Sequence, residues 1–520
     1  MTATSGERLN NYLGGRWQPG QGPGTLLTDP VLGDALVRVD ATGLDLPAGF
    51  EHARRAGGSA LRALSYRERG ALLAAVQATL QKHRDTYFAL SLANSGTVAA
   101  DTGIDVDGAL YTLGVYARLG DTLGDRRHLI DGEPARLAKD PLFQSQHVQV
   151  PTRGLALLIN AFNFPAWGLW AKAAPALLSG VPVVVKPATA TAWVTQRMVQ
   201  DVVEAGVLPP GALSVVCGSS AGLLDALQPF DVLAFTGSAD TAATIRSHAA
   251  VAQRSVRTNI EADSVNSALL LPGEAPGSDS FEALVRDVVR EMTQKSGQKC
   301  TAIRRILVPQ AVYAQAAEAL SARLAQVSVG NPRHSTVRMG SLVSRAQWQS
   351  VMQGIGELRS ATRVLHDGHQ GTWLVDADPA IASCVAPVLL GADDPDGQPL
   401  VHDKEVFGPV ATLMPYRDTE HALALAERGQ GSLAVSLFGA DNAVLAGSAV
   451  RLAASHGRVH VVSPDVARLH TGHGTVMPQS LHGGPGRAGG GEELGGARAL
   501  NFYHRRAAVQ ASTHVLTNLA

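Results

Sequence analysis

The sequence predicts an α/β protein that combines a doubly wound parallel sheet, a second α/β domain and a small β arm. Short apolar runs alternate with helical patterns through the middle of the chain, which is typical of a parallel sheet covered by helices on both faces. The 520 residues are 45% apolar, enough for roughly two to four domains with sizeable cores. The 54 glycines favour many tight turns over long uninterrupted helices.

Four apolar runs define the predicted doubly wound sheet. They are LALLI (155–159), VPVVV (181–185), LSVVC (213–217) and VLAF (232–235). Between the second and third runs, residues 191–204 have apolar side chains at helical spacing, and Gly206 with the following prolines ends that helix. Residues 151–250 are therefore predicted to form successive βα units of a Rossmann-like, nucleotide-binding type.

Helical spacing marks two further segments. Leucines recur at this spacing over residues 71–90, and apolar residues from Phe281 to Met292 follow the pattern i, i+3, i+4, i+7, i+8, i+11. The second of these predicts an amphipathic helix that closes at Gly297. More strands are expected around 302–308, 372–375 and 433–438, which gives a second α/β region over roughly 264–480.

Charge and targeting patterns exclude several classes of function. The 44 Lys and Arg residues balance 45 Asp and Glu residues, so no charge surplus indicates a nucleic-acid or anionic-membrane partner. The N-terminus lacks an apolar segment behind a basic start, and prolines, asparagines and a lysine interrupt the apolar stretch 154–185. We therefore expect a cytoplasmic protein without a membrane partner.

One of the three cysteines has an unusual setting. Cys217 and Cys384 lie in apolar, strand-like runs and are expected in the core, and three cysteines are too few for a secreted disulfide framework. Cys300 instead follows the small and polar residues SGQK, so a turn can present its thiol. The thiolate is the nucleophilic form, and a nearby cation or helix dipole helps to form it. Cys300 is therefore the candidate nucleophile.

Glu261 ends a short strand pattern, VRTNIE, rather than lying on a helix. The ordinary interpretation of such a residue is a solvated acid at a strand end. It gains a catalytic role beside a nucleophile whose covalent intermediate must be hydrolysed, because that step needs a general base.

Two further motifs indicate ligand or hydrolase chemistry. The segment FTGS (235–238) joins a strand to a helix, whose first N–H groups can receive a phosphate. Residues 218–222 fit G-x-S-x-G between a strand and a helix, which keeps a serine hydrolase with Ser220 as nucleophile open as an alternative. The match of 484–489 to G-x-G-x-x-G follows no clear strand, so a glycine-rich turn is expected there.

No metal site is predicted. His470 and His473 have the spacing H-x-x-H, but Gly472 and Gly474 argue against a regular helix and no third ligand is identifiable. A polar loop is the expected structure.

In order along the chain, six motifs resemble the aldehyde dehydrogenase superfamily. They are FNFPAW with Asn163, VVVKPAT with Lys186, FTGS (235–238), Glu261, GQKCT with Cys300, and EVFGP (405–409). The resemblance covers nearly the whole chain and implies that superfamily's fold. The implied division is a cofactor domain of 1–130 and 151–263, a catalytic domain of 264–480, and oligomerisation segments 131–150 and 497–520 that would build a homodimer or homotetramer.

The resemblance also implies roles for individual residues. Cys300 would attack the aldehyde carbon, Asn163 and the Cys300 backbone N–H would hold the oxyanion, and Glu261 would activate the hydrolytic water. Lys172 and Glu493 would carry the proton away. The implied cofactor contacts are Lys186, Thr189, Gly218, Phe235, Gly237, Ser238, Glu405 and Phe407.

The residue three positions after Lys186 bears on cofactor choice. Superfamily members that prefer NAD commonly have an acidic residue there, whereas this chain has Thr189. A carboxylate would repel a 2′-phosphate and Thr can donate to it, so we expect NADP rather than NAD.

The sequence departs from the superfamily pattern after Glu261. The usual Gly-Gly-Lys is replaced by ADSV (262–265), and Cys300 follows 39 positions after Glu261, a longer interval than usual. We therefore expect altered geometry around Glu261. The residue itself is kept, whereas CoA-acylating relatives lack this base, so the resemblance implies a free acid as product.

The tail region 476–496 resembles dehydrogenases that oxidise ring-opened CoA-thioester semialdehydes in aerobic benzoate and phenylacetate degradation. The expected reaction is therefore NADP-dependent oxidation of a CoA-linked semialdehyde to the acid. An aldehyde dehydrogenase for free aliphatic or aromatic aldehydes is a second alternative, beside the serine hydrolase.

Overall fold

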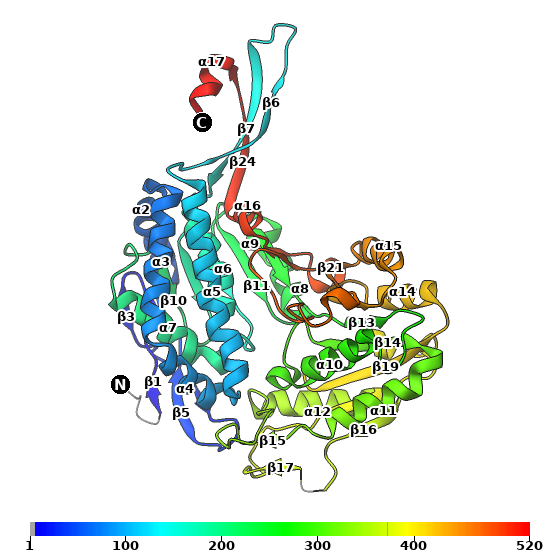
Figure 1. The fold of residues 1–520 in the computed structure, drawn as a ribbon. Helices are drawn as coiled ribbons and strands as arrows, with labels where there is room; N and C mark the ends of the chain where they lie inside the picture. The colour runs from blue at the N-terminus through cyan, green and yellow to red at the C-terminus, as the bar shows by residue number, and fades with distance from the viewer. Residues whose placement is uncertain (1–5, 372, 520) are drawn as a thin grey trace.

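A computed structural model describes residues 6–371 and 373–519 (Figure 1). Two α/β lobes lie side by side, and a long β arm that carries the C-terminus projects away from one of them. This is the α/β architecture that the alternating apolar and helical patterns predict. Within the described ranges, no helix is long and apolar enough to cross a membrane.

The first lobe is built on a seven-stranded sheet with the order β12-β11-β8-β9-β10-β2-β3. Its five parallel strands are β8 (Ala156–Ile159), β9 (Val183–Lys186), β10 (Leu213–Val215), β11 (Val232–Thr236) and β12 (Arg257–Glu261). The hairpin of β2 (Asn11–Leu13) and β3 (Arg16–Gln18) extends the edge in antiparallel fashion. The strand order reverses between β8 and β11, and such a switch point opens a crevice at the carboxyl ends of the strands.

Helices cover both faces of this sheet. Val183 and Val185 of β9 pack into one apolar core and Val184 packs into the other, as alternate strand residues must. One face carries α3 (Tyr66–Lys82), α4 (Arg84–Ser95), α5 (Ala99–Leu123), α6 (Trp167–Leu178) and α7 (Ala192–Glu204). The other carries α1 (Leu46–His52), α8 (Ala239–Ser247) and α9 (Ala249–Ala252).

The helical pattern over 71–90 is confirmed, but it is divided between two helices, α3 and α4. Ser65 and Glu68 make a capping box that starts α3, and His83 adopts a non-helical φ of −106° and ψ of 11° between α3 and α4. Leucine spacing alone does not reveal this break, since both helices bury their apolar faces in the same core.

The second lobe is built on another seven-stranded sheet, with the order β16-β18-β19-β14-β13-β20-β21. Its strands are β13 (Asn266–Leu270), β14 (Ile303–Pro309), β16 (Arg363–Asp367), β18 (Val388–Gly391), β19 (Val410–Tyr416), β20 (Ser432–Phe438) and β21 (His456–Val462). All neighbouring pairs are parallel except the edge pair of β16 and β18. The chain thus passes from one sheet to the other between Glu261 and Asn266.

The helices of the second lobe include α10 (Asp279–Thr293), α11 (Tyr313–Leu324), α12 (Arg345–Arg359), α14 (Thr419–Glu427) and α15 (Asn442–Leu452). The amphipathic spacing from Phe281 to Met292 predicts α10 correctly. The strand predicted over 372–375 is reduced to β17 (Leu374–Val375), which pairs with β15 (Val329–Gly330), and residue 372 lies outside the described residues.

The arm is a three-stranded antiparallel sheet formed by distant parts of the chain. It contains β6 (Leu129–Arg136), β7 (Phe143–Pro151) and β24 (His504–Ser512), and β24 pairs with β7 over its whole length. A separate small sheet near the N-terminus contains β1 (Glu7–Arg8), β4 (Thr25–Thr28) and β5 (Ala35–Val39). The assembly role of the arm stays a prediction.

A short hairpin joins the two lobes beside β12. Its strands are β22 (Leu481–Gly483) and β23 (Glu492–Leu494), so a strand does precede the glycine-rich turn, contrary to expectation. This hairpin is antiparallel rather than part of a βαβ unit. A Cβ on Gly489 would lie 2.3 Å from the Ile260 carbonyl oxygen, so glycine permits the close approach to β12. The hairpin thereby brings His482 and Glu493 to the end of β12.

Candidate active site

Cys300 follows a strained turn after α10. Lys295 and Ser296 have φ values of 52° and 54°, and Gly297 continues in the left-handed region with φ 70°. Non-glycine residues in this region cost about 1 to 3 kcal/mol each, so the surrounding structure must hold the turn. A Cβ on Gly297 would lie 2.2 Å from the Gly408 carbonyl oxygen, which leaves room only for glycine.

Buried side chains from other elements hold this turn. The Asp101 carboxylate on α5 accepts a 2.8 Å hydrogen bond from the Lys295 backbone N–H. The Asn266 side-chain amide donates to the backbone oxygens of Cys300 and Ala302, at 2.8 and 3.0 Å. These contacts tie the cysteine to both lobes. They escape sequence analysis because Asp101 and Asn266 belong to none of the recognised motifs.

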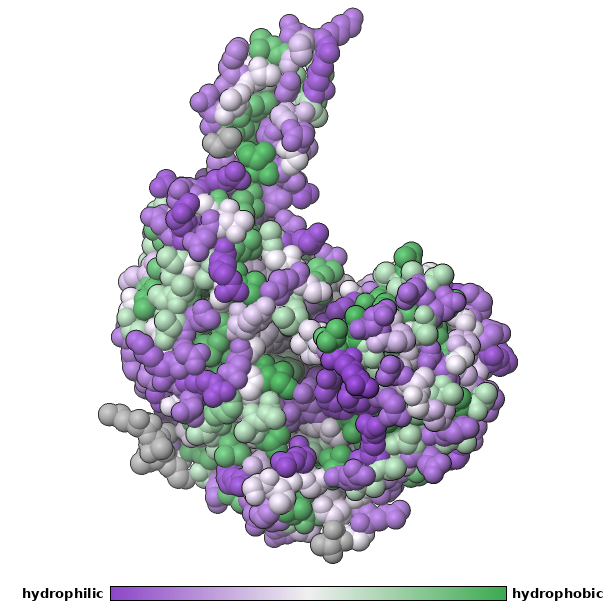
Figure 2. Space-filling view, viewed as in Figure 1, coloured by the Kyte–Doolittle hydropathy of each residue, from purple (hydrophilic) through white to green (hydrophobic). Residues whose placement is uncertain are grey.

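Two cavities meet at Cys300. One, of about 630 Å³, lies at the switch point of the first sheet, and the other, of about 440 Å³, lies against α5 and α6. Figure 2 shows the surface hollowed between the two lobes. The larger cavity is lined, among others, by Asn163, Lys186, Thr189, Phe235, Gly237, Ser238, Glu261, Glu405 and Phe407. The structure thus brings together most of the residues that the superfamily resemblance singles out.

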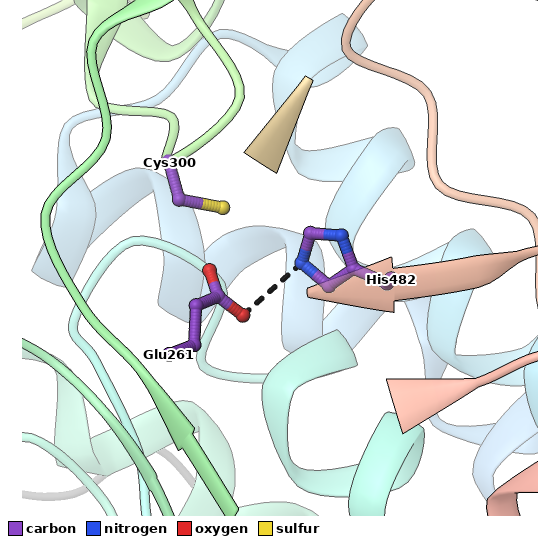
Figure 3. A group of neighbouring side chains, drawn as sticks. All are labelled: Glu261, Cys300 and His482. Carbon is purple, nitrogen blue, oxygen red and sulfur yellow. Dashed lines mark ion pairs between the residues drawn. The ribbon is translucent and has the colours of Figure 1, made fainter. Parts of the chain in front are cut away.

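Glu261 lies at the carboxyl end of β12, and its carboxylate, the Cys300 sulfur and the His482 ring converge on one point (Figure 3). His482 Nε2 is 3.1 Å from Glu261 Oε2, and both residues are buried. Burial alone would raise the pKa of the Glu261 carboxyl, but the charges of His482 and Lys172 outweigh it and lower that pKa. His482 had no place in the sequence prediction, although it belongs to the recognised tail region.

The thiol of Cys300 has a raised pKa rather than a lowered one. Removal from water is the main cause, and the negative charges of Glu261 and Glu405 add to it, whereas Lys172 opposes them. Lys172 therefore supplies the positive charge expected to favour the thiolate, but burial and the two negative charges outweigh it. Lys299, the cation next in sequence, pairs with Glu291 at 2.8 Å instead.

The other two cysteines are core residues, as predicted. Cys217 packs in the core of the first lobe, and Cys384 packs in a small apolar cluster with Val329 and Met339. Burial raises the pKa of each thiol to about 12. Cys300 is thus the one thiol that lines both cavities.

Lys172 on α6 and Glu493 on β23 form a buried ion pair. Their Nζ and Oε2 atoms are 3.1 Å apart, and the Asn259 amide lies 3.4 Å from the other Glu493 oxygen. A cavity of about 10 Å³ adjoins the pair, close to the space that one water needs. Asn259 lies on β12, two positions before Glu261, so this polar group adjoins the candidate base.

The predicted cofactor contacts lie along the larger cavity, with one exception. Lys186 at the end of β9 and Thr189 both line it. Gly218 does not, because it packs against the backbone of Asp40 and Ala41 and its carbonyl accepts a 3.3 Å hydrogen bond from the Thr189 hydroxyl. Gly218 therefore acts on the cavity only through Thr189.

The N-terminus of α8 opens into the same cavity. Ser238 caps this helix, and Asp263 accepts a 3.0 Å hydrogen bond from the Ala239 N–H. Asp263 belongs to the segment that replaces the usual Gly-Gly-Lys. One N–H group expected to meet a phosphate is thus already paired. A Cβ on Gly237 would lie 2.5 Å from the Phe235 ring, so the residue must be small here.

Glu405 and Phe407 form the opposite wall of the cavity. Glu405 accepts a 3.2 Å hydrogen bond from the Ser264 N–H, while its Oε1 is buried without a partner in the described ranges. Burial raises the pKa of Glu405 to about 7, against the attraction of Arg304. The Phe407 ring packs edge-to-face on Phe162, 5.7 Å between centroids. An orphaned buried acceptor of this kind fits the hydroxyl groups of a ribose.

The smaller cavity offers Cys300 an apolar approach. Its lining includes Tyr111 and Thr112 on α5, Phe164, Trp167 on α6, and Met477. Such a channel can take an acyl chain that ends at the sulfur.

The serine hydrolase alternative gains no geometric support. Ser220 is exposed, and no histidine in the described part of the chain hydrogen-bonds to it. His470 and His473 lie in a loop, as predicted, although His473 is fully buried within it. The expectation that His470 has no further ligand beside it is wrong, because Asp287 and His460 place donor atoms within 4.8 Å of it. His473 bonds the Ser436 hydroxyl at 2.6 Å and the Thr301 carbonyl at 2.8 Å, so it supports the turn beside Cys300.

Fold and site together define an aldehyde dehydrogenase, an oxidoreductase that uses NAD(P), and residues 17–509 match the description "Aldehyde dehydrogenase family". The chain belongs to this family. It is 55% identical over 478 residues to 3,4-dehydroadipyl-CoA semialdehyde dehydrogenase of Aromatoleum evansii, covering 92% of this chain and 93% of that protein. It is 24% identical over 496 residues to betaine aldehyde dehydrogenase of Vibrio vulnificus, covering 95% of each chain.

Solved structures share the fold. Lactaldehyde dehydrogenase from Escherichia coli superposes with a TM-score of 0.83 at 20% identity, over 97% of this chain and 99% of that one. An aldehyde dehydrogenase of Pseudomonas syringae, solved with NAD⁺ and octanal, gives 0.80 at 22% identity over 96% of both chains. The predicted aldehyde dehydrogenase fold is therefore confirmed.

Proposed function

We propose that this enzyme oxidises a CoA-linked semialdehyde, 3,4-dehydroadipyl-CoA semialdehyde, to the free carboxylic acid with NADP. The observation that carries the chemistry is the position of Cys300, where the two cavities meet beside Glu261. The substrate is supported by the relative from Aromatoleum evansii, which is named for it and is 55% identical.

Cys300 acts as the nucleophile. Its sulfur attacks the aldehyde carbon while the thiol proton leaves, and the Asn163 amide and the Cys300 N–H receive the developing oxyanion. Such donors contribute about 10²- to 10³-fold each to the rate. A nicotinamide held in the larger cavity would supply the acceptor for the hydride that leaves the same carbon, and Cys300 would keep the substrate as a thioester.

Glu261 takes the proton of the water that hydrolyses this thioester. Lys172 and Glu493 lie on the route by which the proton then leaves, since their ion pair adjoins Glu261 and a small polar cavity. The reaction consumes one aldehyde, one water and one oxidised cofactor, and it yields the acid, the reduced cofactor and a proton.

Lys186, Thr189, Gly237, Ser238, Glu405 and Phe407 would hold the cofactor. The unpaired Oε1 of Glu405 supports this, because ribose hydroxyls would satisfy it. The preference for NADP is supported by the positive charge of Lys186 and by the absence of a repelling carboxylate at position 189. The Thr189 hydroxyl would turn from the Gly218 carbonyl to donate to a 2′-phosphate. The β arm would join two copies of the chain, as the sequence implies.

A panel of aldehydes tests the proposal. Initial rates are measured for the CoA-linked semialdehyde, its free-acid analogue and aliphatic and aromatic aldehydes, each with NADP and with NAD. The proposal expects the highest kcat/KM for the CoA-linked substrate with NADP, and the free acid as product without added CoA. Equal rates with free aldehydes would refute the CoA-linked substrate, and a large preference for NAD would refute NADP. A product that forms only with added CoA would refute the free acid.

A further inference from the structure

Glu261, Cys300 and His482 bring three different metal-binding atoms together (Figure 3). The carboxylate oxygen, the sulfur and an imidazole nitrogen all lie within 4.8 Å of one another. They come from three separate parts of the chain, namely the end of β12, the turn after α10, and β22. The tertiary fold, and not the local sequence, therefore brings these three donors together.

One atom that faces this point has no partner. Glu261 Oε1 is buried and makes no hydrogen bond within the described ranges, whereas His482 Nε2 pairs with the other Glu261 oxygen, Oε2, at 3.1 Å. The two residues are 4% and 1% exposed. Buried polar atoms rarely lack a partner, so the free Glu261 oxygen is available to a ligand at this point.

The donor set selects the metal. Thiolate sulfur, imidazole nitrogen and carboxylate oxygen are the ligands of zinc, whereas Ca²⁺ and Mg²⁺ take oxygen ligands almost alone. Three protein ligands with water in the fourth position are the arrangement of zinc sites that are not closed by protein. Glu261 and Cys300 line the larger cavity and Cys300 also lines the smaller one, so an ion could reach these donors from solvent.

We propose that Glu261, Cys300 and His482 form an inhibitory zinc site that switches the enzyme off reversibly. On binding, the S–H bond of Cys300 breaks, a Zn–S bond forms and the proton passes to solvent, so no electron is transferred. The sulfur can then neither attack an aldehyde nor be oxidised, and Glu261 is no longer free to activate water. Removal of the zinc by a chelator restores both groups.

A second cluster in the same lobe provides a matched control. Asp287, His460 and His470 also place their donor atoms within 4.8 Å of one another. However, Arg290 and Arg286 lie 3.1 and 4.0 Å from the Asp287 carboxylate and already pair with that ligand, whereas Lys172, the cation near Glu261, pairs with Glu493 instead. This cluster also lacks a sulfur ligand, so it should bind zinc weakly or not at all.

Cobalt(II) gives a readout that does not depend on activity. The full-length enzyme is stripped of metal with a chelator and titrated with Co²⁺, whose bond to a thiolate produces near-ultraviolet charge-transfer absorption. Zinc affinity is then measured by displacement of Co²⁺, and zinc protection of Cys300 is measured as its rate of alkylation by iodoacetamide. The variants are His482→Phe, His482→Gln, Cys300→Ser and, as the control, His470→Gln.

The wild type should bind one equivalent of Co²⁺ with sulfur charge transfer, and Cys300→Ser should lose that band. Residues that only support a ligand change metal affinity by about 10- to 100-fold, so loss of the His482 ligand should weaken zinc binding at least about 100-fold. Zinc should slow alkylation in the wild type and in His470→Gln alike. The proposal is overturned if the wild type shows no charge-transfer band, if both His482 variants keep wild-type zinc affinity, or if His470→Gln loses it. None of these readouts needs the CoA-linked substrate, so the proposed function can fail independently.

Discussion

Glu261, which is buried, and Glu405, which is half-buried, line the same cavity, yet their pKa values are shifted in opposite directions. At Glu261, the charges of His482 and Lys172 outweigh burial and keep the carboxylate ionised. At Glu405, burial outweighs the attraction of Arg304 and raises the pKa to about 7. The charges around them thus give two glutamates of one cavity different pKa values.

The difference separates two tasks in one reaction. On the proposed mechanism, Glu261 acts on water after the thioester has formed, so it must be ionised while buried. Glu405 acts before that step, as an acceptor for hydroxyl groups of the cofactor, and its Oε1 is held without a protein partner. The predictions below test whether the two carboxylates act at different stages.

Replacing Cys300 with alanine should have the largest effect, because it removes the step on which both carboxylates depend. We expect aldehyde-dependent formation of NADPH to fall at least about 10⁴-fold. Cys384→Ser serves as the control, since that thiol is buried in an apolar cluster away from both cavities. Retained activity in Cys300→Ala together with loss in Ser220→Ala would instead favour the serine hydrolase.

Glu261→Gln should lower steady-state turnover by about 10²- to 10⁴-fold, the range of general base catalysis. The hydride step should be much less affected, so the thioester on Cys300 should accumulate and be visible by mass spectrometry of the quenched enzyme. If turnover falls without any acyl-enzyme, Glu261 acts earlier than proposed.

Glu405→Gln should lower kcat/KM for the cofactor by about 10- to 100-fold, because it removes a charged hydrogen-bond acceptor. Its hydrolytic step should be unchanged, so no acyl-enzyme should accumulate. Cofactor binding is measured by fluorescence titration, and an unchanged affinity with slow thioester hydrolysis would invert the assignment of the two residues.

Thr189→Glu should reverse the cofactor preference, because a carboxylate at this position repels a 2′-phosphate. The ratio of the rate with NADP to the rate with NAD should fall by about tenfold or more. Initial rates with NADP and NAD measure it, and Thr189→Gln is the uncharged control. Equal losses of rate with both cofactors would mean that Thr189 supports the cavity through its hydrogen bond to Gly218 and does not contact the 2′-phosphate.

The smallest expected effect is on pH dependence. Glu405 is ionised above its pKa of about 7 and protonated below it, so kcat/KM for the cofactor should fall as pH drops through 7. Glu405→Gln should lose this inflection and keep the rest of the profile. An inflection that survives in the variant belongs to another group.

The motifs predict where the reactive residues lie in the chain but not what surrounds them. Cys300 and Glu261 could be identified because each stands at the end of a recognisable element. Asp101 and His482 could not, because they approach Cys300 from segments that lie about 180 or more positions away and nothing local marks them. The pKa of Cys300 is likewise set by burial and by Glu261, which only the folded chain brings together.

Rapid-mixing measurement of NADPH formation in Glu261→Gln and Glu405→Gln tests the separation of tasks most directly. The proposed mechanism predicts a burst of one NADPH per active site in Glu261→Gln, followed by slow turnover, because hydrolysis has become limiting. It predicts slow formation without a burst in Glu405→Gln. A burst in Glu405→Gln and none in Glu261→Gln would contradict the roles assigned to the two carboxylates.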